Sequence, residues 1–432
     1  MDLVLLIIIF ILFGLIILSY SKSGLDFVAI SLLCCFIAAT ITFLVTGTTL
    51  NDFISFIEWP AIIIVLSMSI ITKIAQDANI LEYIGVKLFK LCNGDQRIFF
   101  WLICIITTFL ASIISDVVVV LILAPIVIRL CHFLKIRAGT YLLGMTICIN
   151  IGSIITPFSS GENIIISTAF NLNTVFFIRY YWIFSFLLLF LTIFLLDRLF
   201  LRKEPKIEEI QKKFVIDLVD TDVMVKNRKM FYFNSIAILI TILLFGILPL
   251  LYLTAAISAL ILVLVNKSYT KKPMSELLKD IEWEIIFFFI SLYVVVGCLG
   301  EAGFAEIFQA LPFDTLNPLL ISVLLLLIVS FISGVVANTP TALVFIPIVQ
   351  TLIGASNSLE IPLLFSFIVG INLGGNFIPQ GAAADMMTLK IARDSGVDNL
   401  NYRRLLKIGA LFAFFHIGIA MLSLLILVPL FG

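Results

Sequence analysis

Apolar stretches of about the length of a membrane span recur along this chain and limit what it can fold into. They lie near residues 3–20, 25–45, 60–74, 98–130, 139–175 and 180–200, and again near 231–248, 249–266, 283–298, 318–352, 362–395 and 405–431. A helix of about 20 apolar residues crosses the hydrocarbon core of a bilayer. With 62% hydrophobic residues and a mean hydropathy of +1.21, the sequence predicts an all-α polytopic membrane protein whose main partner is the lipid bilayer.

Several other classes of protein do not fit the sequence. The formal net charge is zero, and no long basic tract indicates nucleic-acid binding. The seven cysteines include no CxxC pair, so neither a disulfide framework nor a zinc site is indicated. The first stretch, Met1 to Tyr20, lacks the basic start and the small-residue cleavage site of a signal peptide, and we expect it to be retained as a span.

The chain is divided by one polar segment, residues 202–230, which carries eight Lys or Arg and six Asp or Glu. The two flanking parts, 1–201 and 231–432, resemble each other. "IEW" (57–59) recurs as "IEW" (281–283), "APIVI" around Pro125 recurs as "IPIVQ" around Pro347, and "NIGSIITP" (150–157) recurs as "NLGGNFIP" (372–379). The last two matches share one offset of 222 residues. We therefore predict an internal duplication joined by a cytoplasmic linker at 202–230.

Loop charges indicate that the two repeats face opposite ways. Seven Lys or Arg lie between Glu58 and Ser167, whereas the aligned interval from Asp280 to Leu389 contains none. The loop at 46–58 has only acids, whereas its counterpart at 266–279 has four lysines. Because Lys and Arg are enriched in cytoplasmic loops, the pattern predicts two inverted-topology repeats in the cytoplasmic membrane. This architecture is typical of secondary transporters, which bind substrate where the repeats meet near the bilayer midplane.

Two stretches, 98–130 and 318–352, are too long for one span. The first has basic residues at both ends, and the second has none on either flank. We expect two re-entrant helical hairpins that enter from opposite sides, with pairs of full spans as the alternative. Non-helical backbone at that depth is tolerated where protein or water covers it. Each repeat would then hold about five spans, a hairpin and a broken helix.

The candidate substrate and ion site lies at the two hairpin tips and the two broken helices. Its predicted residues are Ser115, Asp116, Thr156, Pro157, Ser159, Ser160, Gly161, Glu162 and Asn163 in the first repeat, and Asn338, Thr339, Pro340, Asn376, Pro379, Gly381 and Asp385 in the second. Pro157 and Pro379 are expected to stop one half of each broken helix, and the small residues after them to unwind it.

These residue types suit ion binding. An ionisable group inside a span, such as Asp116, is expensive to bury and is a functional candidate. The amides of each new half-helix would face an anion or a polar substrate, while loose carbonyls at the preceding half-helix end would suit Na⁺. Burial makes Glu162 a candidate proton carrier. We expect no cofactor beyond Na⁺ or H⁺ as coupling ion, with Na⁺ near Asp116, Asn163, Asn338 and Asp385. The alternatives are structural: neighbouring hydroxyls could satisfy Asp116, and Glu162 and Asp385 could cap helices.

The chain resembles the ion transporter superfamily, which includes arsenite permeases, NhaD-type sodium–proton antiporters and citrate or dicarboxylate–sodium transporters. "GSIITPFSSGEN" is similar to the arsenite-permease-like pattern G-S-x-x-T-P-I-G-N-P-Q-N, departing from it at 159–162. The hairpin tips, Ser115-Asp116-Val117 and Ala337-Asn338-Thr339, are similar to the Ser-Asn-Thr motifs of the dicarboxylate branch. The resemblance implies a scaffold and a transport part in each repeat, a homodimer, and elevator-like movement. In some arsenite permeases an ATPase subunit associates, which makes it a candidate partner for 202–230.

The predicted site holds three acids and no Lys or Arg, which favours a small inorganic ion or oxyacid. We therefore predict a proton- or sodium-coupled secondary transporter, either arsenite-like or exchanging Na⁺ for H⁺. The alternative is a sodium-coupled symporter of di- or tricarboxylate, sulfate or phosphate. A passive channel would not need duplicated buried acids. The sequence has no HExxH motif and only two, distant histidines, so we expect no enzyme.

Overall fold

The computed structural model describes residues 2–21, 25–80, 95–205, 227–248, 250–270, 274–281, 283–304, 317–355 and 359–431, together with single positions at 83, 84, 87, 90, 92 and 225. These residues form helices and connecting turns, with no strand among them. Within the same residues, nine helices are long and apolar enough to cross a membrane. The chain is an all-helical, multi-pass membrane protein, as predicted.

The two repeats contain their long helices in a similar order and differ in their short helices. The first comprises α1 (Leu3–Ser21), α2 (Phe27–Thr46), α3 (Leu50–Ser55), α4 (Trp59–Asp77), α6 (Gln96–Ala111), α7 (Asp116–Phe133), α8 (Gly139–Gly152), α9 (Gly161–Ala169), α10 (Thr174–Tyr180), α11 (Trp182–Leu199) and the 3-10 helix η1 (Leu201–Lys203). The second comprises α13 (Arg228–Ile247), α14 (Leu251–Thr270), α15 (Met274–Leu277), η3 (Leu278–Asp280), α16 (Trp283–Glu301), α18 (Pro318–Val336), α19 (Asn338–Ala355), α20 (Glu360–Gly374), η6 (Pro379–Gly381), α21 (Ala383–Asp394) and α22 (Tyr402–Phe431).

Local sequence signals set several of these helix starts. The Asp95 carboxylate accepts hydrogen bonds from the amides of Arg97 and Ile98 and so begins α6. Asn317 caps α18 in the same way, with Pro318 at its first position. At the first break, the Ser160 hydroxyl accepts from the amide of Asn163 and begins α9. The polar residues that start these helices therefore act through the free amides of the first turn.

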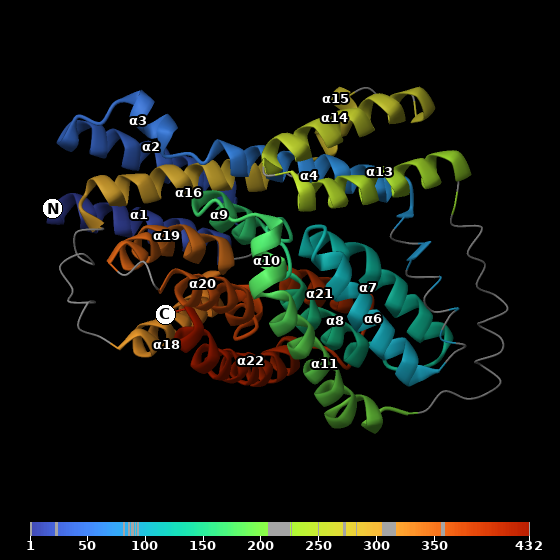
Figure 1. Ribbon diagram of the computed structural model, residues 1–432. Coiled ribbons are helices and arrows are strands. Elements are labelled where there is room, and N and C mark those ends of the chain that lie inside the picture. The colour runs from blue at the N-terminus through green and yellow to red at the C-terminus, as the bar shows by residue number, and fades with distance from the viewer. Residues whose placement is uncertain are drawn as a thin grey trace.

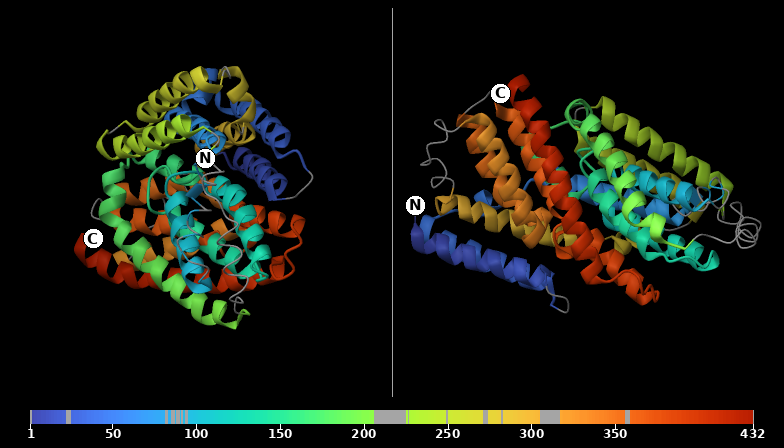
Figure 2. Two further views of the ribbon diagram at one scale, coloured as in Figure 1. Left: turned by 90° about the vertical axis from the view of Figure 1, so that its right-hand side faces the viewer. Right: turned by 90° about the horizontal axis from the view of Figure 1, so that it is seen from below.

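The helices are arranged in two layers (Figures 1 and 2). We call α1, α2, α4, α13, α14 and α16 the six-helix layer. The hairpin layer contains α6–α9, α11 and α18–α22. In Figure 1 the hairpin α6–α7 lies at the right of this second layer, and α18–α19 lies at the left. The short helices α3 and α15 lie toward opposite ends of the six-helix layer, as the loop charges predict for inverted repeats.

Packing between the repeats is reciprocal. Helix α2 packs against α16, and its counterpart α14 packs against α4. The second half of the first broken helix, α9, packs against α19 of the second hairpin, while α21 packs in turn against α7 of the first hairpin. Within each repeat, α6 packs on α8 and α18 packs on α20. This exchange is the arrangement that a two-fold relation between the repeats produces.

The breaks lie where they were expected, but the helices end several residues before the prolines. Helix α8 ends at Gly152 and α20 at Gly374, five residues before Pro157 and Pro379. Both glycines are contact points, because a side chain at Gly152 would overlap the backbone of Thr108, and one at Gly374 the backbone of Ser330. The prolines lie in the following non-α segments.

Other boundaries were less accurate. Within the predicted stretch 139–175, the second half-helix, α9, ends at Ala169, and a separate helix, α10, follows it. The predicted linker, 202–230, lies mostly outside the described residues. At its start, Glu204 accepts a hydrogen bond from the Thr140 hydroxyl (2.6 Å) and lies 3.9 Å from Arg404. The first described linker residues are thus held against the hairpin layer.

Candidate functional site

The tip of the first hairpin places Asp116 at the start of α7. Helix α6 ends at Ala111, and residues 112–115 turn the chain. The Asp116 carboxylate accepts from the amide of Val117 (2.8 Å) and from the Ser115 hydroxyl (3.5 Å). The Thr156 hydroxyl donates to the Ser112 carbonyl (2.5 Å), which joins this tip to the first broken helix.

Asn163 holds the first break together. Its side-chain amide donates to the carbonyl oxygens of Ser153 and Thr156 and to the Ser159 hydroxyl, and its oxygen accepts from Asn372 (2.9 Å). Asn163 is fully buried. The carbonyls of Ser153 and Thr156, expected to be loose and available to Na⁺, are therefore already hydrogen-bonded. These side-chain partners stabilise the buried, non-helical backbone of the break.

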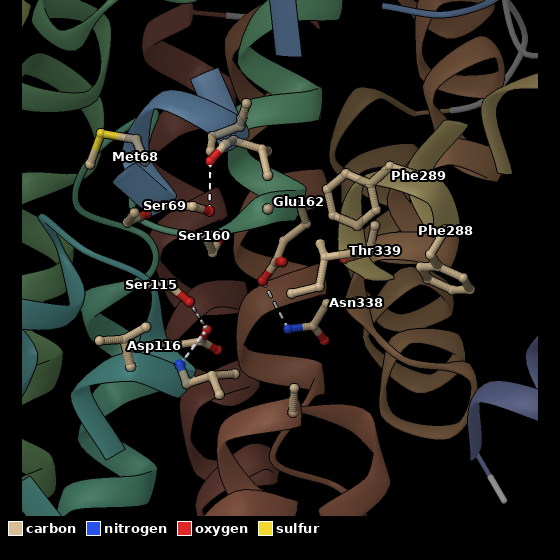
Figure 3. Close-up of a pocket in the computed structure, with 18 of the residues that line it drawn as sticks. Met68, Ser69, Ser115, Asp116, Ser160, Glu162, Phe288, Phe289, Asn338 and Thr339 are labelled. Atoms are coloured by element: carbon tan, nitrogen blue, oxygen red, sulfur yellow. Dashed lines mark hydrogen bonds between the residues drawn. The ribbon is translucent and has the colours of Figure 1, made fainter. Parts of the chain in front are cut away.

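Glu162 and Asn338 join the two repeats directly. Glu162 lies in the first turn of α9 and is 6% exposed, and Asn338 begins α19 at the tip of the second hairpin. The Asn338 amide donates to the Glu162 carboxylate over 3.0 Å (Figure 3). The Asn338 oxygen in turn accepts from the Ser333 hydroxyl (2.7 Å). Residues 176 positions apart in the sequence thus meet through a charge-assisted hydrogen bond.

The hairpin tips and the first break face a central cavity of about 170 Å³ between the two layers. The hairpin layer contributes nine predicted site residues to its wall: Ser115, Asp116, Ser159, Ser160, Gly161, Glu162, Asn338, Thr339 and Gly381. The six-helix layer contributes Ser69, Thr72, Lys73 and Gln76 from α4 and Phe288 and Phe289 from α16. Figure 3 shows Asp116 and Glu162 with their carboxylates turned toward the same space.

Seven predicted site residues lie behind the cavity wall. They are Thr156, Pro157, Asn163, Pro340, Asn376, Pro379 and Asp385. Asp385 is in the first turn of α21 and 1% exposed, and one of its carboxylate oxygens has no hydrogen-bond partner. The neighbouring break is joined to the first repeat by a hydrogen bond from Asn150 to Asn376 (2.8 Å). These residues surround the cavity without lining it.

Charge in the cavity is arranged around helix ends. Asp116, Glu162 and Asn338 all lie in the first turns of their helices, α7, α9 and α19. The N-terminus of a helix carries a partial positive charge that stabilises nearby anions. Three such ends therefore surround two carboxylates, and the same ends would attract a bound anion whenever the carboxylates are neutralised.

One expectation about this charge is wrong. The cavity does contain a basic residue, because Lys73 of α4 lines it, 3.7 Å from Asp77. Ser69, Thr72, Lys73 and Gln76 follow i, i+3, i+4, i+7 spacing and form one polar face of a mainly apolar helix. This helical spacing of polar residues in the sequence could have indicated that α4 faces the site. None of the four residues is unusual when considered alone.

A metal centre of the usual protein kind has no support in the described part of the chain. No three His, Cys, Asp or Glu residues there are grouped closely enough to hold a metal ion. The predicted Na⁺ positions near Asp116, Asn163, Asn338 and Asp385 would instead depend on hydroxyl, amide and carboxylate oxygens, the ligands that hard cations prefer.

Comparisons with known proteins agree with this architecture. An uncharacterized transporter of Mycobacterium bovis is 25% identical over 348 residues, covering 79% of this chain and 80% of the relative. An uncharacterized transporter of Methanocaldococcus jannaschii is 22% identical over 364 residues, covering 84% and 88%. A Dictyostelium discoideum chain provisionally named as the transporter arsB is 32% identical over 119 residues, covering 28% of this chain and 21% of that one.

A solved structure shows the same fold. The YdaH transporter of Alcanivorax borkumensis, whose topology is described as unusual, superimposes with a TM-score of 0.61 and 11% identity, covering 91% of this chain and 89% of that one. The sequence pattern of the citrate transporter family, CitMHS, matches residues 4–370. This match spans both repeats and confirms the resemblance to the ion transporter superfamily. The chain is a membrane transporter that belongs to the CitMHS family.

Proposed function

We propose that this protein is a secondary active transporter of a small inorganic ion or oxyacid, coupled to a proton or sodium gradient. The observation that carries the proposal is the position of Asp116 and Glu162. Both are carboxylates from different elements of the first repeat, and both face one cavity at the level of the helix breaks. Asp116 and Glu162 would carry the coupling cation, as bound Na⁺ or as a proton.

The helix ends explain how such coupling would work. Without a cation, two negative charges face three helix N-termini in a largely buried space. Binding of H⁺ or Na⁺ removes negative charge, which changes what else the cavity can hold. Because a buried, unneutralised charge is costly, the loaded and empty forms differ in their ability to move through the membrane. That difference links the solute to the cation.

The position of the cavity supports an elevator-type movement. Its wall comes from both layers, with the acids and the hairpin tips on one and the polar face of α4 on the other. If the hairpin layer slides past the six-helix layer, the acids move with it and the α4 face stays behind. The cavity would then open first on one side of the membrane and later on the other.

A second candidate function, sodium-coupled symport of an organic or inorganic anion, is favoured by a different observation. Lys73 lines the cavity opposite the acids, and the helix ends of α7, α9 and α19 converge there. These groups recognise anions, and the family is named for citrate transport. The predicted acid-only site argued against such a substrate, and the presence of Lys73 weakens that argument.

The two candidates are separated by flux measurements on purified protein in liposomes. Uptake of arsenite, sodium, phosphate, sulfate and citrate would be followed under an imposed pH gradient or sodium gradient. The proposal predicts accumulation of arsenite, or of sodium against protons, above its equilibrium level. Gradient-driven uptake of citrate, phosphate or sulfate alone would favour the symporter. Simple equilibration of any solute, insensitive to both gradients, would contradict secondary active transport.

A further inference from the structure

A second cavity lies next to the central one. It measures about 710 Å³ and is lined by α21, by the loop that follows α21 and by the start of α22. Its polar lining includes Gln380, Lys390, Arg393, Asp398 and Asn401. The Tyr402 hydroxyl donates to the Gln380 side chain across this wall (2.8 Å). We call this space the vestibule.

The vestibule and the central cavity share two wall residues, Tyr20 and Ala383. Tyr20 lies near the end of α1 in the six-helix layer, and Ala383 is the first residue of α21 in the hairpin layer. Ala383 is exposed, with only a methyl group as its side chain. The two spaces therefore adjoin at a seam between the layers that has a large ring on one side and a small side chain on the other.

The ring of Tyr20 is held in place by two other aromatic residues of its own layer. It stacks on Phe288 with 4.8 Å between ring centres, and it meets the edge of Phe27 at 5.5 Å. Phe27 and Phe288 also contact each other at 5.6 Å. Three mutually packed rings from α1, α2 and α16 leave Tyr20 little freedom. The Tyr20 side of the seam is thus fixed, while Ala383 belongs to the layer that carries the hairpins.

Charge indicates which side of the membrane the vestibule faces. Lys390 and Arg393 line it, and Arg403, Arg404 and Lys407 follow in the first turns of α22. The central cavity extends toward Lys73 and Gln76, near the end of α4. Acids mark the other end of α4, where Asp52 and Glu58 precede it. By the enrichment of Lys and Arg in cytoplasmic loops, the vestibule opens to the cytoplasm.

From these observations we propose that solute passes between the cytoplasm and the central cavity through the vestibule, across the seam formed by Tyr20 and Ala383. The inference rests on the proposed transport function. It adds a defined cytoplasmic route and two residues that set its width. Because Tyr20 is fixed and Ala383 travels with the hairpin layer, movement of that layer changes the opening.

Thiol labelling tests the route without knowledge of the substrate. All seven native cysteines are buried, so a single added cysteine can report on accessibility. Ser69→Cys places the reporter in the central cavity, and Asn401→Cys places one in the vestibule. A membrane-impermeant methanethiosulfonate reagent is added to inside-out vesicles. We expect both reporters to react. Adding Ala383→Phe should slow labelling of Ser69→Cys at least 10-fold and leave Asn401→Cys unchanged.

Two further variants separate blockage of the route from a general effect of substitution on the fold. Leu411→Phe adds the same kind of bulk at an exposed apolar position on α22 and should not slow labelling. Tyr20→Ala should speed labelling of Ser69→Cys. An unchanged rate for Ser69→Cys in both Ala383→Phe and Tyr20→Ala would overturn the route, as would labelling of this reporter only in right-side-out vesicles. Because no solute flux is measured, these outcomes stand apart from success or failure of the proposed transport activity.

Discussion

Asp116 and Glu162 share one cavity although they come from different parts of the first repeat. Asp116 is placed by the tip of a hairpin, and Glu162 by the restart of a broken helix. Each is in the first turn of its helix, where amides and the helix dipole favour a negative charge. An acid in this position can be stable when charged and still be available to a cation that enters the cavity.

Replacing Asp116 by asparagine should abolish gradient-driven uptake. The amide oxygen of Asn can still accept from Val117, so assembly should be retained, but the charge that would bind H⁺ or Na⁺ is lost. Uptake into liposomes under a pH or sodium gradient measures the effect. Glu301→Gln removes an exposed acid at the end of α16 and serves as control. Wild-type uptake by Asp116→Asn would exclude this residue from coupling.

The bond between Asn338 and Glu162 should contribute to stability as a pair. Asn338→Ala and Glu162→Ala are each expected to destabilise the protein. The double variant should lose less stability than the sum of the two single losses. A hydrogen bond to a charged group contributes roughly 1.5–3 kcal/mol, which sets the coupling energy. Unfolding of the wild type, the two single variants and the double variant in detergent micelles gives this double-mutant cycle. Strict additivity would show that the bond is not formed.

Some of these residues could be predicted from the sequence and others could not. Asp116 and Glu162 stand out because acids are rare within apolar stretches, and both line the cavity. Asn163 was expected to lie near Na⁺, but its amide nitrogen donates within the break, and its oxygen, the atom that could bind a cation, accepts from Asn372. Lys73 was not among the predicted site residues, although it lines the cavity. Whether a side chain faces a cavity depends on helix packing across the two layers, which local sequence does not reveal.

At the scale of elements, the hairpins and broken helices follow from sequence more closely than their exact ends. Stretch length and flanking charge predicted two helical hairpins, and α6–α7 and α18–α19 are pairs of helices joined by a short turn. Their re-entrant character stays a prediction, because α18 and α19 are each long and apolar enough to cross a membrane. The breaks were predicted from the prolines, and α8 and α20 end five residues earlier, at glycines that touch the neighbouring hairpin. A glycine contact of this kind depends on a partner far away in the chain, so single-sequence reasoning cannot locate it.

Adding one methyl group at Gly374 should destabilise the second repeat. The new Cβ of Gly374→Ala would overlap the Ser330 carbonyl, so α18 and α20 would have to separate. Overpacking of this kind costs about 1–3 kcal/mol, which thermal unfolding in detergent would detect. Gly354→Ala is the matched control, because nothing lies within 4 Å of its Cβ position. Equal melting temperatures for the two variants would contradict the close contact.

At the scale of the molecule, reciprocal packing makes the two repeats one unit. Neither hairpin is completed by its own repeat alone, since α9 packs on α19 and α21 on α7. The sequence repeats at an offset of 222 predicted the duplication, and loop charge predicted its inversion. Which helices exchange partners had to come from the structure. The proposed homodimer and an ATPase subunit on 202–230 stay predictions.

The inverted arrangement predicts the location of two loops. Thr49→Cys, in the acidic loop before α3, should react with an impermeant thiol reagent only from outside the cell. Lys279→Cys, in η3 of the second repeat, should react only from the cytoplasm. Labelling in right-side-out and inside-out vesicles provides the measurement. Reaction of both positions from the same side would contradict inverted repeats.

Alternating access is tested most directly by a cysteine at Thr339, which lines the central cavity at the tip of the second hairpin. The Thr339→Cys protein would be labelled from each side in turn under opposite pH and sodium gradients. We predict reaction from the cytoplasm under one gradient and from outside under the reverse gradient. Reaction from a single side under every gradient, or from both sides at rates that no gradient alters, would contradict a transport site that moves between the two faces of the membrane.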